Sequence, residues 1–173
     1  MTKPPIGTED HPTFTARYGP LFEHSPWIAA QSWRPGGYPG PEAMLQAMVQ
    51  TLRNAGTQAQ RTLFQAHPEL AGPETEAGTL TQASTTEQSS AGLDRLTPED
   101  LARQRRLNDA YRAHHGIPFI ICVRNHTRAT ILAELERRTP RPTAIEHEEA
   151  LTQVIAIARL RLAQLLTPTH PAQ

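Results

Sequence analysis

Apolar residues recur at the spacing of an α-helix in several parts of the 173-residue chain. One stripe follows Pro41 and consists of Met44, Leu45, Met48, Val49 and Leu52. A longer stripe follows Thr143 and consists of Leu151, Val154, Ile155, Ala158, Leu162 and Leu165. No segment shows the period-two alternation of a half-buried strand, so the pattern predicts an all-α bundle of short helices.

Capping residues and helix breakers delimit the predicted helices. The expected N-caps are Ser25, Thr57, Thr97, Thr127 and Thr143, the last forming a capping box with Glu146. The expected helix ends are Gly56, His67, Gly116 and Pro140. The run 117–123 is too short to show a period, and we expect a buried connection or helix start there rather than a strand.

The signals for regular helix are interrupted between His67 and Leu93. Pro68 disfavours helical dihedrals at the preceding residue, so His67 should stand extended at the end of a helix. Residues 73–83 carry little apolar mass and predict a long polar, mobile loop. Ser84 and Glu87, spaced as a capping box, should begin the next helix.

The length is typical of one domain, which we expect to span residues 13–166. Residues 1–12 and 167–173 are expected to be tails. No apolar stretch approaches the length of a membrane span, and the N-terminus lacks the apolar core of a signal peptide. These features predict a soluble, cytoplasmic protein.

The charged residues exclude several kinds of chemistry. The formal net charge is zero, which gives no support for binding nucleic acid through phosphate neutralisation. Lys3 is the only lysine, so mechanisms that need a buried lysine amine are excluded. The single cysteine, Cys122, cannot form an internal disulfide and is expected to be a small buried residue.

No motif of a metal site is present in the sequence. His114 and His115 are adjacent and would point about 100° apart on a helix, which predicts a solvated helix end. The acidic residues of 146–149 lie in a predicted first turn, where surface charge interacts favourably with the helix dipole. We therefore expect no metal.

The remaining candidates for chemistry are His67, Ser84, Glu87 and Gln88. They have a structural interpretation, as a helix end and a capping box. They also have a functional one, in which His67 and Glu87 form a proton-transfer pair. Residues 62–94 contain no lysine or arginine, so an anionic ligand would need positive charge from elsewhere. Arg159 and Arg161 lie on opposite edges of the last apolar stripe, and spacing does not choose between them.

Six sequence strings occur in order along the chain: YGPLFEHSPW at 18–27, HPELAG at 67–72, STTEQSSAGL at 84–93, LNDAY at 107–111, IPFIICVR at 117–124 and IARLRL at 157–162. Together they resemble the OHCU decarboxylases, the 2-oxo-4-hydroxy-4-carboxy-5-ureidoimidazoline decarboxylases of uric acid degradation. The resemblance covers about residues 13–166. The segment 115–119 departs from it, with His-Gly-Ile-Pro-Phe where the family more often has Phe-Gly-Phe-Pro-Phe.

The resemblance implies an all-α, cofactor-free enzyme that forms homodimers and releases CO2 to give (S)-allantoin. It implies that His67 and Glu87 are catalytic. The implied substrate-binding residues are Pro68, Ser84, Gln88, Phe119, Ile121 and Arg161. It thus selects Arg161 over Arg159. Two alternatives stay open: an acid–base enzyme that acts on a related ureide, and a non-catalytic helical interaction module.

Overall fold

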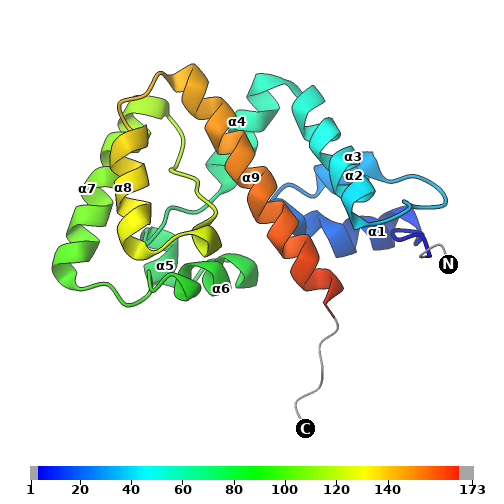
Figure 1. Cartoon of the computed structure of the whole chain (residues 1–173), viewed down its shortest axis with the longest axis horizontal. Coiled ribbons are helices and arrows are strands. Elements are labelled where there is room, and N and C mark those ends of the chain that lie inside the picture. The colour runs from blue at the N-terminus through cyan, green and yellow to red at the C-terminus, as the bar shows by residue number, and fades with distance from the viewer. Residues whose placement is uncertain (1–3, 168–173) are drawn as a thin grey trace, which may run out of the picture. The chain divides into compact units, whose positions relative to one another are not determined.

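The computed structural model describes residues 4–167 and confirms an all-α fold (Figure 1). The α-helices are α1 (His11–Tyr18), α2 (Trp27–Ser32), α3 (Pro41–Asn54), α4 (Gly56–Ala66), α5 (Pro73–Ala77), α6 (Gln82–Ser90), α7 (Pro98–His115), α8 (Arg128–Arg138) and α9 (Thr143–Leu166). Two 3-10 helices are η1 (Gly19–Leu21) and η2 (Val123–Asn125). Most of the predicted C-terminal tail, residues 168–173, lies outside the described residues, as do residues 1–3.

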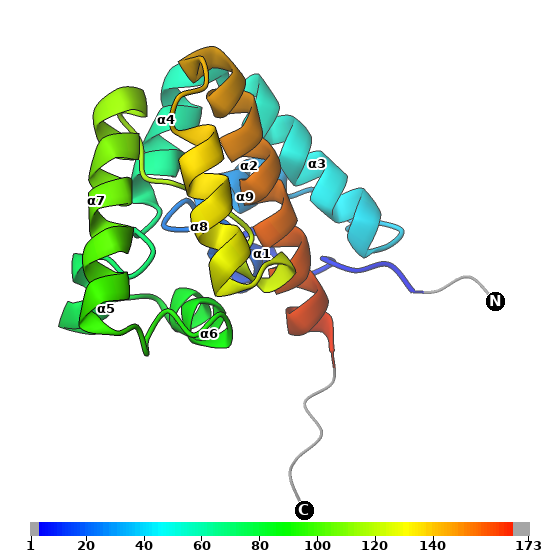
Figure 2. The ribbon, with the colours of Figure 1, turned by 60° about the vertical axis from the view of Figure 1, so that its left-hand side comes forward.

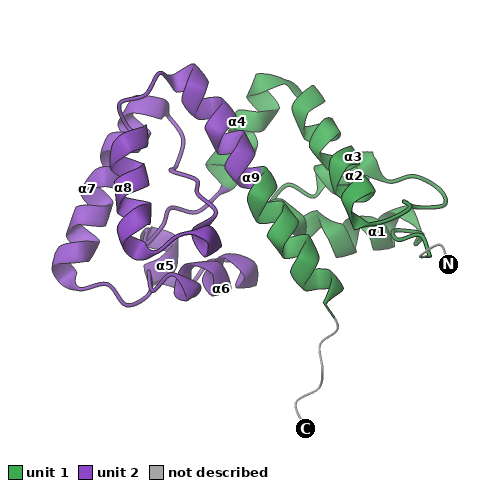
Figure 3. Cartoon of the chain, in the orientation of Figure 1, with its two compact units in different colours: residues 1–66, 155–173 green, residues 67–154 purple. Residues whose placement is uncertain are grey.

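The described chain divides into two compact units (Figure 3). Unit 1 contains residues 4–66 and 155–167, and within it α2 packs against α1 and α3, and α3 packs against α4. Unit 2 contains residues 67–154, and within it α7 and α8 lie side by side (Figure 2). Helix α9 contributes its first half to unit 2 and its second half to unit 1. Within residues 4–167, no helix combines the length and the apolar character needed to cross a bilayer.

The first helix begins two residues before the predicted domain start at Thr13. Asp10 caps α1, because its carboxylate accepts a hydrogen bond of 2.8 Å from the Thr13 N–H. The preceding backbone is also held in unit 1: Ile6 and Tyr38 exchange N–H to C=O hydrogen bonds of 2.9 and 2.8 Å. Residues 6–10 are therefore part of the folded unit.

Local signals placed several helix boundaries correctly, but not the starts of α2 and α4. The N-cap of α2 is Pro26 rather than Ser25, and α4 begins at Gly56, before the predicted cap Thr57. Thr97 caps α7 by accepting from the Asp100 N–H, and Gly116 ends that helix in the left-handed region at φ 70°. Thr127 caps α8 as expected, in a capping box whose other member is Thr130. The run 117–123 is buried and contains no strand, which confirms the predicted connection with Cys122 in the interior.

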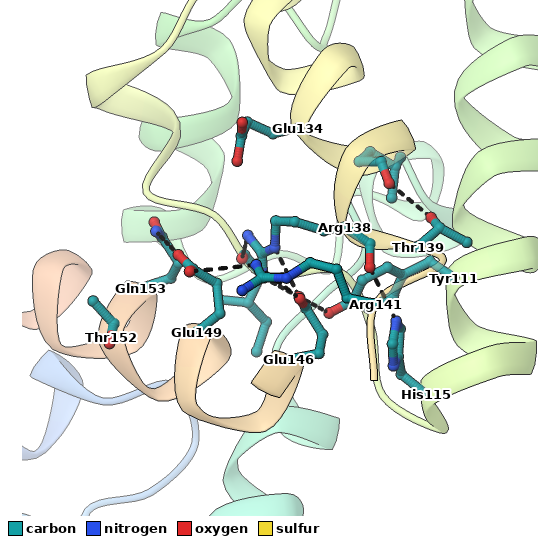
Figure 4. A network of polar contacts seen from close by, with 12 residues as sticks. Tyr111, His115, Glu134, Arg138, Thr139, Arg141, Glu146, Glu149, Thr152 and Gln153 are labelled. Carbon is teal, nitrogen blue, oxygen red and sulfur yellow. Dashed lines mark hydrogen bonds and ion pairs between the residues drawn. The ribbon is translucent and has the colours of Figure 1, made fainter. Parts of the chain in front are cut away.

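A buried ion pair in unit 2 belongs to a network of polar contacts (Figure 4). Arg138 of α8 and Glu146 of α9 are both 0% exposed, and Arg138 Nε donates to Glu146 Oε1 at 2.7 Å. Arg138 Nη1 donates to the Ile120 carbonyl at 2.9 Å, and the Tyr111 hydroxyl donates to Glu146 Oε1 at 2.5 Å. The guanidinium carbon also lies 4.5 Å from the centre of the Phe119 ring. One ion pair thus connects α7, α8, α9 and the 117–122 connection.

The predicted surface position of Glu146 is therefore wrong, and so is its predicted capping box with Thr143. Thr143 is the first residue of α9, and its hydroxyl lies 3.2 Å from Nδ1 of His115. His115 was expected to be solvated, but it is buried against the Tyr111 ring, with ring centres 4.5 Å apart. Desolvation lowers the pKa of His115, which favours the neutral imidazole. Glu146 is buried by Tyr111 of α7 and Arg138 of α8, and His115 also contacts Thr143 of α9 and the Arg138 carbonyl. Local spacing does not reveal these contacts between helices.

Replacing Arg138 by methionine should strongly destabilise the protein. The change removes the hydrogen-bonded charge partner of the buried Glu146 carboxylate and leaves only Arg141, whose Nη1 lies 3.6 Å from Glu146 Oε2. Breaking one side of a buried pair costs about 3–5 kcal/mol. Urea unfolding followed by far-ultraviolet circular dichroism would measure the loss.

Arg137→Met is the matched control, one residue away on α8. Arg137 pairs with Glu134 at 2.7 Å on the surface, and half of its side chain is exposed. Such exposed pairs contribute at most about 1 kcal/mol. Equal losses for the two variants would contradict the structural role given to Arg138.

Candidate active site

His67 stands directly after a helix end. Helix α4 stops at Ala66, so the predicted break before Pro68 is confirmed. The His67 side chain is only 8% exposed, although its backbone belongs to no helix. His67 is thus a buried histidine on irregular backbone.

The turn after His67 has a restricted backbone. The Gly72 N–H donates to the Glu69 carbonyl at 3.2 Å, and Ala71 adopts a φ of 51°. This left-handed conformation is unfavourable for a residue that carries a Cβ. A Cβ at Gly72 would lie 2.6 Å from the Cβ of Glu69, so the turn has no room for a side chain there.

Gln88 of α6 binds this turn through both ends of its amide. Its Oε1 accepts from the Ala71 N–H at 3.0 Å and from the Thr75 hydroxyl at 3.2 Å. Its Nε2 donates to the Glu69 carbonyl at 3.3 Å. Gln88 therefore joins α6 to the segment that follows His67, and contact between Gln88 and a substrate stays a prediction.

Helix α6 begins earlier than predicted. Its N-cap is Thr81, whose hydroxyl accepts from the Ser84 N–H at 3.2 Å. The predicted capping box of Ser84 with Glu87 is therefore wrong. Thr81, whose backbone is extended, provides the capping hydroxyl one turn before Ser84. Ser84 consequently lies buried inside the first turn, and Glu87 lies half-buried three residues further on.

The polar segment 73–83 is more ordered than a long loop. Pro73–Ala77 forms the short helix α5, which Gly78 ends at φ 66°, and only residues 78–81 connect α5 to α6. Residues 62–94 contain no arginine, and two of their glutamates pair with arginines of α7. Arg112 Nε donates to Glu69 Oε1 at 2.8 Å, and Arg105 pairs with Glu76.

The 117–122 connection brings two further predicted site residues to the same unit. Phe119 and Ile121 are both buried, and the Phe119 ring meets that of Tyr111 edge-on at 5.2 Å. Helix α6 packs against η2, which directly follows this connection. Unit 2 thus contains His67, Pro68, Ser84, Glu87, Gln88, Phe119 and Ile121.

The structure distinguishes the two candidate arginines, both of which belong to unit 1. Arg161 is buried, and its Nη1 lies 2.8 Å from Oε2 of Glu23, which is also buried. Arg159 is exposed and pairs with Glu42 on the surface at 3.0 Å. Sequence reasoning did not identify Glu23, although it lies within the string at 18–27.

Two buried amides of α7 were also missed by sequence reasoning. Asn108 Nδ2 donates to the Leu70 carbonyl at 2.9 Å, and Gln104 Nε2 donates to Asn108 Oδ1 at 3.0 Å. The available signal was a glutamine and an asparagine four positions apart, the second of them within the string at 107–111. Across the described residues, no group of three or more acidic, histidine or cysteine side chains is arranged to hold a metal ion.

Comparison with known proteins decides the family. The family model described as OHCU decarboxylase matches residues 8–163, which is most of the chain. The chain belongs to the OHCU decarboxylase family. The resemblance seen in the sequence strings is thereby confirmed. Among curated relatives, the 2-oxo-4-hydroxy-4-carboxy-5-ureidoimidazoline decarboxylase of Halalkalicoccus jeotgali is 36% identical over 173 residues, which is 100% of this chain and 96% of that protein.

Two solved structures are similar to this OHCU decarboxylase family member. The crystal structure of (S)-allantoin synthase gives a TM-score of 0.71 at 26% identity, over 93% of this chain and 52% of that chain. This chain therefore spans about half of that protein's length. The crystal structure of OHCU decarboxylase in the presence of (S)-allantoin gives a TM-score of 0.66 over 92% and 100% of the two chains. At 21% identity, the second likeness shows a shared fold.

Gly72→Ala should distort the turn that follows His67. The new methyl group would clash with the Cβ of Glu69, which lies close to the backbone and cannot move aside freely. Overpacking of this kind costs on the order of 1–3 kcal/mol. Thermal and urea unfolding would measure the change.

Gly40→Ala serves as the control, because Gly40 has an extended φ of 176° and no atom within 4 Å of the position of a Cβ. It should change the free energy of unfolding by less than about 1 kcal/mol. If Gly72→Ala leaves the free energy of unfolding unchanged, the turn accommodates the methyl group without strain and the prediction is wrong.

Proposed function

We propose that this chain is a cofactor-independent decarboxylase that converts 2-oxo-4-hydroxy-4-carboxy-5-ureidoimidazoline to (S)-allantoin and CO2 in uric acid degradation. The observation that carries the proposal is the family match over residues 8–163. Full-length similarity to a relative of that name supports it. The burial of His67 beside a restricted turn supports its assignment to the site.

The substrate supplies its own electron sink. One ring carbon carries both the hydroxyl and the carboxylate, and the neighbouring ring carbon is an imine carbon that carries the ureido group. The carboxylate leaves as CO2, and the electron pair of the broken bond forms a double bond between these two carbons. The imine electron pair moves to its nitrogen, which takes up a proton. The resulting enol then loses its hydroxyl proton, and the adjacent carbon gains one. Delivery of this last proton to one face sets the S configuration.

Proton transfer is the task we assign to His67 with Glu87. An imidazole exchanges protons near neutral pH, and a carboxylate partner fixes its tautomer. Ser84, Gln88 and Pro68 are proposed to bind the polar ring, and Phe119 and Ile121 to line its apolar side. Arg161 is proposed to hold the anionic ring, since a guanidinium can donate two parallel hydrogen bonds.

The homodimer and the cytoplasmic location belong to this proposal as well. The homodimer rests on the family resemblance. Light scattering coupled to size-exclusion chromatography would test the dimer, and fractionation of cells that express the protein would test the location. A monomer in solution would remove the dimer from the proposal without affecting the chemistry.

His67→Asn should lose stereospecific allantoin formation while retaining the fold. The amide keeps polarity but cannot exchange a proton, and loss of a general acid–base group lowers the rate by about 10²–10⁴-fold. Circular dichroism of the product is the measurement, because unaided decay of the substrate would give racemic allantoin.

His114→Asn is the control, since His114 is an exposed histidine of α7. Its progress curve should match that of the unmodified protein. A His67 variant with an unchanged circular dichroism progress curve would refute the assignment of His67.

Arg161→Lys should raise KM for the substrate by about tenfold, because lysine retains the charge beside Glu23 but loses the two-pronged donor geometry. Arg159→Lys makes the same change at an exposed pair and should leave KM within about twofold. Steady-state kinetics of both variants would distinguish the arginines. The reverse ranking would assign the substrate contact to Arg159.

A further inference from the structure

A row of buried amides connects α7 and α6 to the turn after His67. Gln104 Nε2 donates to Asn108 Oδ1 at 3.0 Å, and Asn108 Nδ2 donates to the Leu70 carbonyl at 2.9 Å. From the other side, Gln88 Oε1 accepts from the Ala71 N–H at 3.0 Å. The three amide side chains are all buried.

The two contacts on the turn bind one and the same peptide group. The carbonyl of Leu70 and the N–H of Ala71 belong to the single planar unit that joins these residues. Asn108 therefore holds the oxygen end of this plane from α7, and Gln88 holds the nitrogen end from α6. A plane bound at both ends cannot rotate without breaking two buried hydrogen bonds.

The backbone at Ala71 favours that rotation. Its φ of 51° lies in the left-handed region, which crowds the Cβ of any residue other than glycine. Turning over the Leu70–Ala71 peptide changes ψ of Leu70 and φ of Ala71 together, and lets Ala71 return to negative φ. The amides of Asn108 and Gln88 hold the plane against this relaxation.

We propose that Asn108, oriented by Gln104, is a positioning residue for the reaction. It acts through the Leu70–Ala71 peptide on the turn that carries His67, and it makes no contact with the substrate. The segment 67–69 has no helical hydrogen bonds, so the course of its backbone depends on how the turn that follows it is held. The inference rests on the proposed function for the catalytic role of His67.

Asn108→Asp is the decisive variant. Aspartate has the same shape, but its ionised form cannot donate and places a second acceptor against the Leu70 carbonyl. We expect kcat to fall about tenfold to a hundredfold with KM changed by less than about twofold, since misplaced catalytic groups affect the chemical step.

The pH profile separates positioning from general damage to the core. Burial raises the pKa of a carboxyl group, and a protonated carboxyl regains a donor. The ratio of kcat for Asn108→Asp to kcat for the unmodified protein should therefore rise as the pH falls. A packing defect would leave the ratio independent of pH and would overturn the inference.

Asn54→Asp is the matched control. Asn54 accepts from Gln50 Nε2 at 2.8 Å, an asparagine and glutamine pair with the same spacing, but on the exposed face of α3. Its kinetics should equal those of the unmodified protein. Should Asn108→Asp fail to fold at the assay temperature, Gln104→Glu carries the test, with a smaller fall in kcat in the same direction.

Amide hydrogen exchange at Ala71 gives a readout that needs no substrate. The Ala71 N–H should be protected in the unmodified protein and exchange at least about tenfold faster in Asn108→Asp, because the peptide plane is released. If the unmodified protein is inactive but its Ala71 N–H is protected, the proposed function is refuted. The hold of Asn108 and Gln88 on the Leu70–Ala71 peptide is then still supported. An active protein whose kcat is unaffected by Asn108→Asp would overturn the positioning role.

Discussion

The ion pair of Arg138 with Glu146 is the contact on which the interior of unit 2 depends. Removing two charges from water is costly, and the loss is recovered only when the geometry is good and the remaining donors are satisfied. Here the guanidinium donates to the carboxylate and to the Ile120 carbonyl, and its face lies over Phe119. The pair therefore determines where helices α8 and α9 meet and which way the 117–122 connection runs.

Polar side chains of helices also satisfy the backbone of the two irregular segments of unit 2, the 117–122 connection and the turn after His67. Backbone without helical hydrogen bonds must find other partners when it is buried. Arg138 satisfies the Ile120 carbonyl, and Gln153 accepts from the Cys122 N–H at 2.9 Å. Asn108 and Gln88 do the same for the Leu70–Ala71 peptide. Polar side chains of neighbouring helices thus hold the backbone next to the proposed site residues of unit 2 that lie outside helices.

Sequence reasoning succeeded where the determining chemistry is local. Pro68 and Gly116 end their helices for reasons that lie within one or two residues. It failed where two local candidates competed, as when Thr81 rather than Ser84 became the cap of α6. It also failed at Glu146, whose acidic character in a first turn matches an exposed residue and whose partner lies on another helix. Arg161 was selected by resemblance, and its burial beside Glu23 was not visible in the apolar pattern.

The position of the single cysteine has a practical consequence. Cys122 forms no disulfide and lies in the interior of unit 2, within the connection that carries Phe119 and Ile121. A thiol reagent reaches such a sulfur only during transient openings of the surrounding structure. The rate at which Cys122 is alkylated therefore reports how often the surrounding structure opens. This measurement needs neither an introduced label nor enzymatic turnover.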